Sequence, residues 1–265
     1  MNIVVCVKAV PNMVGLVKLK ENARDIVKSD MLYKINDTDD NALEEAVRLK
    51  EKIGGKVTVI TVSSGEDGEN ARQILWECYA KGADHAIHLV DKLFTGIDSF
   101  TTAKLLAEAI KHIPFDLILT GSQALDDNFG HVGPMLAEFL GIPYVTFVVK
   151  MDISDKDKEI LAWMELDGGF KKVIKPRLPG LITVQSGINE PRYASVSRIM
   201  MARSKPIETI NADGLGVSEE LISSWRKFKI ESLSVVEGKK TMFISGNLEE
   251  TSLTLAKLIS DIIGE

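Results

Sequence analysis

The strongest candidate for chemistry is a polar loop between an apolar strand and an apolar helical run, within Ile118–Glu138 (ILTGSQALDDNFGHVGPMLAE). The loop contains Gly130 and Gly133, and Pro134 stands at the start of the helical run. Glycine lets a ligand approach the main chain, proline is favoured in the first turn of a helix, and a helix N-terminus attracts phosphate. We therefore predict that this loop holds the phosphate of a nucleotide. The alternative is an ordinary strand-to-helix connection.

Histidines give little sign of catalysis. His85 and His88 lie around an expected buried strand, where a structural role is favoured, and His112 ends a helix, where a cation is favourable. Only His131 lies in the candidate loop, and we expect it to hydrogen-bond a phosphate there. The motifs of dinucleotide-binding folds, P-loops, serine hydrolases and zinc proteases are all missing from the sequence.

Two further segments could bind ions or phosphate. Asp126 and Asp127 could bind Mg²⁺, but adjacent loop residues rarely converge on one point, so we expect capping and solvation and no metal site. The segment Ser63–Gly68 (SSGEDG) loosely resembles the phosphate loop of ATP pyrophosphatases, although that loop follows the first strand and this one the second. Ser64 and Gly65 are therefore candidates for phosphate or ribose contacts only.

The elements that must position these residues alternate regularly over residues 1–140. Short apolar strands are expected at Ile3–Val7, Val57–Val62, His85–Val90 and Asp116–Thr120. Amphipathic helices separate them: one is capped by Thr38 and stopped by Gly54-Gly55, one ends at Gly82, and one opens at Ser99. This alternation predicts an α/β fold with a parallel, doubly wound sheet. Ligands collect at the carboxyl edge of such sheets, where four loops meet: Lys8–Asn12, Val62–Gly68, Val90–Thr95 and Thr120–Gly133.

The pattern changes after Pro143. Successive strands at Tyr144–Ile153, Ile160–Leu166 and Phe170–Ile174 predict an antiparallel excursion, closed by a strand at Leu181–Val184. Later we expect a short helix at Leu221–Phe228, a strand at Met242–Ser245 and a last amphipathic helix over 248–262 capped by Asn247. We divide the chain into a nucleotide-binding domain, residues 1–188, and an extended arm with a C-terminal helix, residues 189–265, which needs another surface.

Bulk properties narrow the class of protein. The net charge of −6 over 265 residues argues against a general nucleic-acid binder. Cys6 and Cys78 lie in apolar segments, as expected for reduced thiols in a cytoplasmic protein. Apolar runs stay well below the ~18 residues of a transmembrane helix, and the N-terminal apolar stretch is too short for a signal peptide.

A family resemblance appears at Asn189–Met200. Its sequence, NEPRYASVSRIM, resembles the signature NEPRYA[ST]LPNIM of the β subunit of electron transfer flavoproteins. Three other segments resemble that family in the same order over nearly the whole chain: Asn36–Ala46, Gln123–Gly133 and Met164–Val184. The chain is therefore identified as a member of this family, which implies an adenine nucleotide alpha hydrolase-like sheet and an extended C-terminal arm.

The resemblance also implies partners and cofactors. The protein is expected to form a heterodimer with an α subunit that holds most of an FAD, and to dock a flavin dehydrogenase such as an acyl-CoA dehydrogenase. Electron chemistry then belongs to the flavin, so we expect no catalytic side chain. The sheet of this subunit would hold a second nucleotide, which is AMP in ordinary members and, in electron-bifurcating members, a second FAD that takes a hydride from NADH.

The loops and the resemblance together give two sets of residues. The cofactor-binding set is Ala9, Asp39, Ser64, Gly65, Thr120, Gly121, Gln123, Asp126, Asn128, Phe129, Gly130, His131, Val132 and Gly133. The partner-docking set is Asn189, Glu190, Pro191, Arg192, Tyr193, Val196, Ile199 and Met200.

Several residues depart from the family pattern. Thr38 replaces the usual Phe near the flavin, Met13 stands where some members have Tyr, and Val196 stands where the docking loop usually has Leu. The changes at Thr38 and Met13 predict an altered flavin-facing surface.

The nucleotide loop, Asp126–Pro134 (DDNFGHVGP), is intermediate between the two subtypes. Asp127 resembles the AMP-binding type, whereas Val132 and Pro134 resemble the bifurcating type. Gly130 is small, as in the second type, and Phe129 matches neither. We slightly favour a second FAD.

Two other functions were weighed. A free-standing protein that binds or hydrolyses ATP through Ser63–Gly68 would need no partner, but the displaced loop and the unsupported arm argue against it. A scaffold with a vestigial nucleotide is the other alternative.

Overall fold

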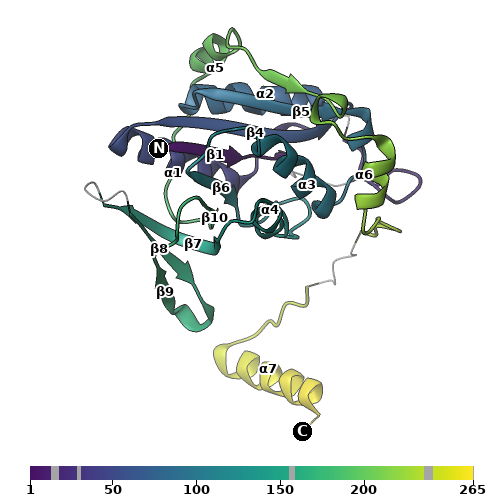
Figure 1. The fold of residues 1–265 in the computed structure, drawn as a ribbon. Coiled ribbons are helices and arrows are strands. Elements are labelled where there is room, and N and C mark those ends of the chain that lie inside the picture. The colour runs from purple at the N-terminus through teal and green to yellow at the C-terminus, as the bar shows by residue number, and fades with distance from the viewer. Residues whose placement is uncertain (13–17, 29–30, 155–158, 236–240, 265) are drawn as a thin grey trace.

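The computed structural model describes residues 1–12, 18–28, 31–154, 159–235 and 241–264 (Figure 1). Met13, which we expect to alter the flavin-facing surface, lies outside these ranges. The described strands form one large sheet and one small one. The order in the large sheet is β11 (Glu208–Ile210), β5 (His85–Asp91), β4 (Lys56–Ser64), β1 (Asn2–Cys6), β6 (Leu117–Gly121), β10 (Gly180–Val184), β7 (Tyr144–Ile153), β8 (Ile160–Glu165) and β9 (Lys171–Ile174). The small sheet pairs β2 (Ala9–Pro11) with β3 (Tyr33–Ile35).

Helices cover both faces of the large sheet. One core lies under α1 (Asp37–Ile53) and α2 (Gly68–Lys81), and the other under α3 (Ser99–Ile110), α4 (Val132–Leu140) and α6 (Glu219–Trp225). Further helical segments are η1 (Lys92–Phe94), η2 (Asp167–Gly169), α5 (Val196–Ala202), η3 (Asp213–Leu215) and α7 (Leu248–Ile263). The α/β class and the parallel, doubly wound sheet are thus confirmed. Of the described helices, none is long and apolar enough to cross a membrane.

The order of the strands predicts a ligand site beside β1. The chain runs outward from β1 to β4 and β5, and then crosses to β6 on the other side of β1. At such a reversal the connections leave toward opposite faces, so a gap opens at the carboxyl ends of the two central strands. The segments that follow β1 and β6 border this gap. They begin with Lys8 and with the loop after Gly121.

The antiparallel excursion is confirmed for β7, β8 and β9. The strand predicted at Leu181–Val184 is present as β10, but its assignment to this excursion is wrong. β10 runs parallel to both β6 and β7, so it is an inner strand of the main sheet. All five of its residues are buried. Burial on both faces is typical of an inner parallel strand and explains why Leu181, Ile182 and Val184 are all apolar.

Part of the expected arm packs on the sheet. β11 pairs in parallel with β5, and Trp225 at the end of α6 is buried in the core under α3. The division of the chain at residue 189 stays a prediction about domains, but packing against the sheet continues to residue 225.

The strand expected at Met242–Ser245 does not form among the described residues, because it has no neighbouring strand to pair with. The last helix and its Asn247 cap are confirmed, and Figure 1 shows α7 apart from the sheet.

We predict that Trp225→Ala lowers the free energy of unfolding by about 3–5 kcal/mol, because it removes a buried indole and leaves a cavity. Denaturant unfolding measures the change. Phe243→Ala is the control: Phe243 is 86% exposed, so its loss should cost less than about 0.5 kcal/mol. A loss below about 1 kcal/mol for Trp225→Ala would show that this segment is not part of the folded core.

Candidate nucleotide-binding site

A buried carboxylate closes the gap between β1 and β6. Asp39, in the first turn of α1, accepts the backbone N–H of Lys8 at 2.8 Å and that of Gly121 at 2.9 Å. Burial raises the pKa of Asp39 to about 7, against the opposite effect of these hydrogen bonds. Each oxygen thus satisfies the main chain where one of the two strands ends.

The start of α1 also fixes the loop after β6. Thr38 was expected to cap the helix, but the N-cap is Asn36, and the Thr38 hydroxyl donates instead to the carbonyl of Gln123 at 2.8 Å. Asn36 donates to the same carbonyl at 2.9 Å and accepts the N–H of Leu125 at 2.9 Å. The helix can approach this closely only because residue 121 is glycine: a Cβ there would lie 2.2 Å from Thr38 Oγ1.

Lys8 forms ion pairs with both adjacent acids of the loop. Its Nζ lies 2.7 Å from Asp126 Oδ1 and 2.9 Å from Asp127 Oδ2, so the expectation that these carboxylates do not converge is wrong. Burial opposes the charged amine, but the two carboxylates outweigh it and raise the pKa of Lys8. The lysine offsets negative charge that would otherwise repel a phosphate at this loop.

The start of α4 offers hydrogen-bond donors. The helix begins at Val132, and within the described chain its N-cap, His131, makes no capping hydrogen bond with its side chain. The N–H groups of Val132 and Gly133 therefore have no acceptor inside the helix. Gly133 is buried, and a Cβ there would lie 2.7 Å from Thr183 Cγ2, so glycine lets the helix start pack against β10. These free donors fit the phosphate of a nucleotide.

The same loop carries two aromatic side chains, Phe129 and His131. Asn128 and Gly130 have φ values of +54° and +63°, in the left-handed region, and hold Phe129 between them. Phe129 stacks on His131 with ring centroids 5.7 Å apart, and 43% of its surface stays exposed. The turn itself requires glycine at 130, so the small size of that residue is not evidence for a longer ligand.

Ser64 and Gly65, the predicted phosphate or ribose contacts, lie where β4 ends. β4 extends to Ser64, so Ser63 and Ser64 belong to a strand and not to a loop. Ser63 bonds to His88 Nε2 at 2.7 Å, and Ser64 donates to Asp67 at 3.0 Å. Burial lowers the pKa of His88 to about 4, which fits its expected structural role.

The structure therefore joins some predicted residues and not others. Hydrogen bonds and ion pairs link Asp39, Gly121, Gln123 and the Asp126–Asp127 pair into one network through Lys8 and the start of α1. In the chain as described, Ser64 and Gly65 make no hydrogen bond to this network. Asn36 was missed, although an Asn just before a run of acids is a usual sign of a helix start.

The predicted docking segment is fixed at its base and exposed at its tip. Asn189 and Asn41 exchange side-chain-to-backbone hydrogen bonds of 2.9 and 3.0 Å. Arg192 binds Glu44 at 2.8 Å and Glu51 at 2.7 Å, and these acids raise its pKa. Beyond this anchor Tyr193, Val196, Met200 and Met201 are exposed, by 81%, 70%, 57% and 75%.

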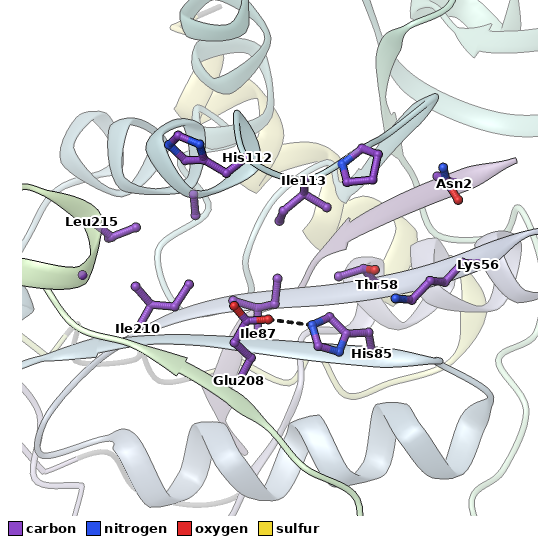
Figure 2. Close-up of a pocket in the computed structure, with 13 residues that line it drawn as sticks. Asn2, Lys56, Thr58, His85, Ile87, His112, Ile113, Glu208, Ile210 and Leu215 are labelled. Carbon is purple, nitrogen blue, oxygen red and sulfur yellow. Dashed lines mark hydrogen bonds and ion pairs between the residues drawn. The ribbon is translucent and has the colours of Figure 1, made fainter.

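A hollow of about 400 Å³ lies at the opposite edge of the sheet, where β1, β4 and β5 begin (Figure 2). Isoleucines 87, 113 and 210 line it, and His85 Nε2 lies 2.8 Å from a carboxylate oxygen of Glu208 at its wall. This hydrogen bond ties β11 to β5. Within the described ranges no cluster of three or more His, Cys, Asp or Glu residues could hold a metal ion.

The structure is thus an α/β protein with unpaired backbone donors at the start of α4 and an exposed segment at Tyr193–Met201. The family model "Electron transfer flavoprotein domain" matches residues 25–215. The chain is 36% identical over 263 residues to the electron transfer flavoprotein subunit beta of Thermoanaerobacterium thermosaccharolyticum, covering 98% of each chain. It is 41% identical over 187 residues to the subunit beta of Bacillus subtilis, 70% of each chain. It is 37% identical over 222 residues to the caffeyl-CoA reductase-Etf complex subunit CarD of Acetobacterium woodii, covering 83% of this chain and 82% of the relative.

The chain belongs to the electron transfer flavoprotein β-subunit family. The resemblance at Asn189–Met200 is thereby confirmed, and the free-standing ATP-binding alternative is not favoured.

We predict that Asp39→Asn destabilises the protein by about 1–3 kcal/mol at neutral pH, because the amide can accept only one of the two backbone N–H groups. The pH dependence should also change. A carboxyl group with a pKa of about 7 in the folded state and ~4 when unfolded favours folding below pH 4, and this contribution is lost as the pH rises to 7. The wild type should lose stability relative to the variant by up to about 1.4 kcal/mol per pH unit over this window.

Urea unfolding between pH 4.5 and 7.5 measures both effects. Asp37→Asn is the matched control, since it removes a carboxylate from the same first turn without removing the acceptor of Lys8 and Gly121. Parallel profiles of stability against pH for wild type and Asp39→Asn would contradict the raised pKa of Asp39.

Proposed function

We propose that this chain is the β subunit of a heterodimeric electron transfer flavoprotein that carries electrons between a flavin-dependent dehydrogenase and an acceptor. An α subunit would hold most of one FAD, which supplies the redox chemistry when bound. Family membership supports the class of protein. The observation that carries the proposal is the free α4 N-terminus near the carboxyl ends of the central strands, in a chain whose α1 holds both the loop before α4 and the exposed segment after Arg192.

The second nucleotide is proposed to bind at this gap. The N–H groups of Val132 and Gly133 would hold its phosphate, while Lys8 limits the negative charge of Asp126 and Asp127. We place FAD before AMP at this site, with NADH as hydride donor, because Val132 and Pro134 resemble the bifurcating type.

One relative is a subunit of a caffeyl-CoA reductase-Etf complex, which supports an enzyme acting on CoA esters, such as an acyl-CoA dehydrogenase, as partner. The buried, free thiols of Cys6 and Cys78 support a cytoplasmic location.

The number of flavins tests the subtype. Each heterodimer formed with the α subunit should release two FAD molecules and no AMP on denaturation, as measured by absorbance and chromatography. Gly133→Ala should lose only the second nucleotide, since an added Cβ displaces the start of α4 and leaves the FAD held by the α subunit in place. One FAD together with one AMP per heterodimer would contradict the second FAD while leaving the electron-carrier function intact.

Docking is tested at the exposed tip. We predict that Val196→Asp reduces electron transfer from the partner dehydrogenase at least tenfold while FAD stays bound. Val196 is 70% exposed and is the first residue of α5, where an acid favours the helix, so the loss would reflect docking and not unfolding.

Stopped-flow reduction of the flavin measures the rate of transfer. Ser197→Asp is the control, because it adds the same charge to the next residue without removing an apolar side chain. An unchanged rate for Val196→Asp would remove this segment from the docking surface.

A further inference from the structure

Three aromatic rings from two distant segments meet at the nucleotide loop. Phe228, which follows α6, packs its ring edge-on against Phe129, with centroids 5.3 Å apart and planes at 79°. Phe129 in turn stacks on His131 at an angle of 10°. Phe129, His131 and Phe228 form what we call the aromatic cluster. It joins the loop after β6 to the point where the C-terminal arm begins.

The arm is fixed at this point by the main chain. Asp98, the N-cap of α3, accepts the backbone N–H groups of Lys227 and Phe228 at 2.5 and 3.2 Å, as well as that of Thr101 at 2.8 Å. Arg226 donates to the carbonyl of Thr95 at 2.9 Å. Burial opposes ionisation of Asp98, but these N–H donors outweigh it and lower its pKa. The position of Phe228 is therefore set by the body of the domain, and the residues just beyond it, 229–232, are exposed.

The cluster leaves aromatic surface uncovered next to the free donors of α4. Phe129 and Phe228 are 43% and 42% exposed. Two left-handed residues, Asn128 and Gly130, fix the backbone on either side of Phe129. A non-glycine residue in this region costs free energy, which a useful position of its neighbour can offset. Exposed aromatic faces beside a phosphate site suit the flat ring of a nucleotide, since all such rings can stack.

We propose that Phe129 and Phe228 form an aromatic wall of the nucleotide site, so that a bound adenine or flavin ring packs beside the point where the chain leaves the domain and restrains the exposed residues beyond Phe228. This inference rests on the proposed nucleotide site. Phe228 acts as a positioning residue through Phe129, and the same contact links occupancy of the site to the arm. AMP and FAD share the required chemistry, a flat heteroaromatic ring with a phosphate, and separate titrations distinguish them.

Affinity is the first measurement. In calorimetric titrations of the full chain with AMP and with FAD, Phe228→Ala should raise the Kd of the nucleotide that binds by roughly threefold to tenfold, the range expected for one lost aromatic contact. Phe228→Tyr should restore the wild-type value within about twofold, because it keeps the ring. Phe243→Ala is the matched control: it removes an exposed phenylalanine from the same arm and should leave Kd unchanged. Phe129→Ala combined with Phe228→Ala should cost no more than Phe129→Ala alone, since both remove one contact.

Protection of the arm is the second measurement. Lys229, whose side chain is 78% exposed, gives trypsin a cleavage site directly after the cluster. Saturating nucleotide should slow cleavage there several-fold in the wild type and in Phe243→Ala, but not in Phe228→Ala. A purely structural role for Phe228 would change the rate of cleavage equally with and without nucleotide.

The outcomes separate this inference from the proposed function. Equal Kd values for wild type and Phe228→Ala, or cleavage that nucleotide does not slow in the wild type, would overturn the aromatic wall while leaving the nucleotide site in place. A wild-type chain that binds neither AMP nor FAD would overturn the site itself and the wall with it.

Discussion

The bond between Asp39 and the ends of β1 and β6 is the constraint on which the rest of this structure depends. A doubly wound sheet opens a gap where its strand order reverses, and the main chain there has donors without strand partners. One buried carboxylate satisfies both sides of the gap, through Lys8 and Gly121. Its position demands glycine at 121 and brings the side chain of Lys8 to the nucleotide loop. The proposed nucleotide site is thus built outward from a single acid.

Helix α1 connects the two proposed functional regions. Its first turn holds the nucleotide loop through Asn36, Thr38 and Asp39, and residues further along it hold the docking segment through Asn189 and Arg192. The distance between the regions is therefore set by a rigid element, not by a flexible loop. For a protein that positions a flavin between partners, such rigidity serves the function, because electron transfer depends on a reproducible distance. Much of the polar surface of α1 is accordingly buried in hydrogen bonds.

The sequence predicts local features well and long-range pairing poorly. Alternation of apolar strands and amphipathic helices identifies the parallel sheet, and the glycines and proline after β6 indicate the turn and helix start of the proposed ligand loop. In contrast, Thr38 has the chemistry of a cap, and only the folded chain shows that its hydroxyl bonds to Gln123 instead. The convergence of Asp126 and Asp127 depends on Lys8, more than a hundred residues earlier. The parallel setting of β10 and the pairing of β11 with β5 likewise depend on neighbours that no local pattern reveals.

The end of the chain shows how packing separates segments of similar composition. Residues 206–225 join the domain because β5 offers a free edge and the core under α3 takes up their apolar side chains, including Val217, Ile222 and Trp225. Helix α7 is strongly amphipathic and has a complete capping box, but none of its residues is buried against the described chain. Caps and propensity alone hold a helix of this length only marginally in water. Its apolar side, which includes Leu248, Leu255 and Ile262, therefore requires burial from another surface, as the proposed α subunit would provide.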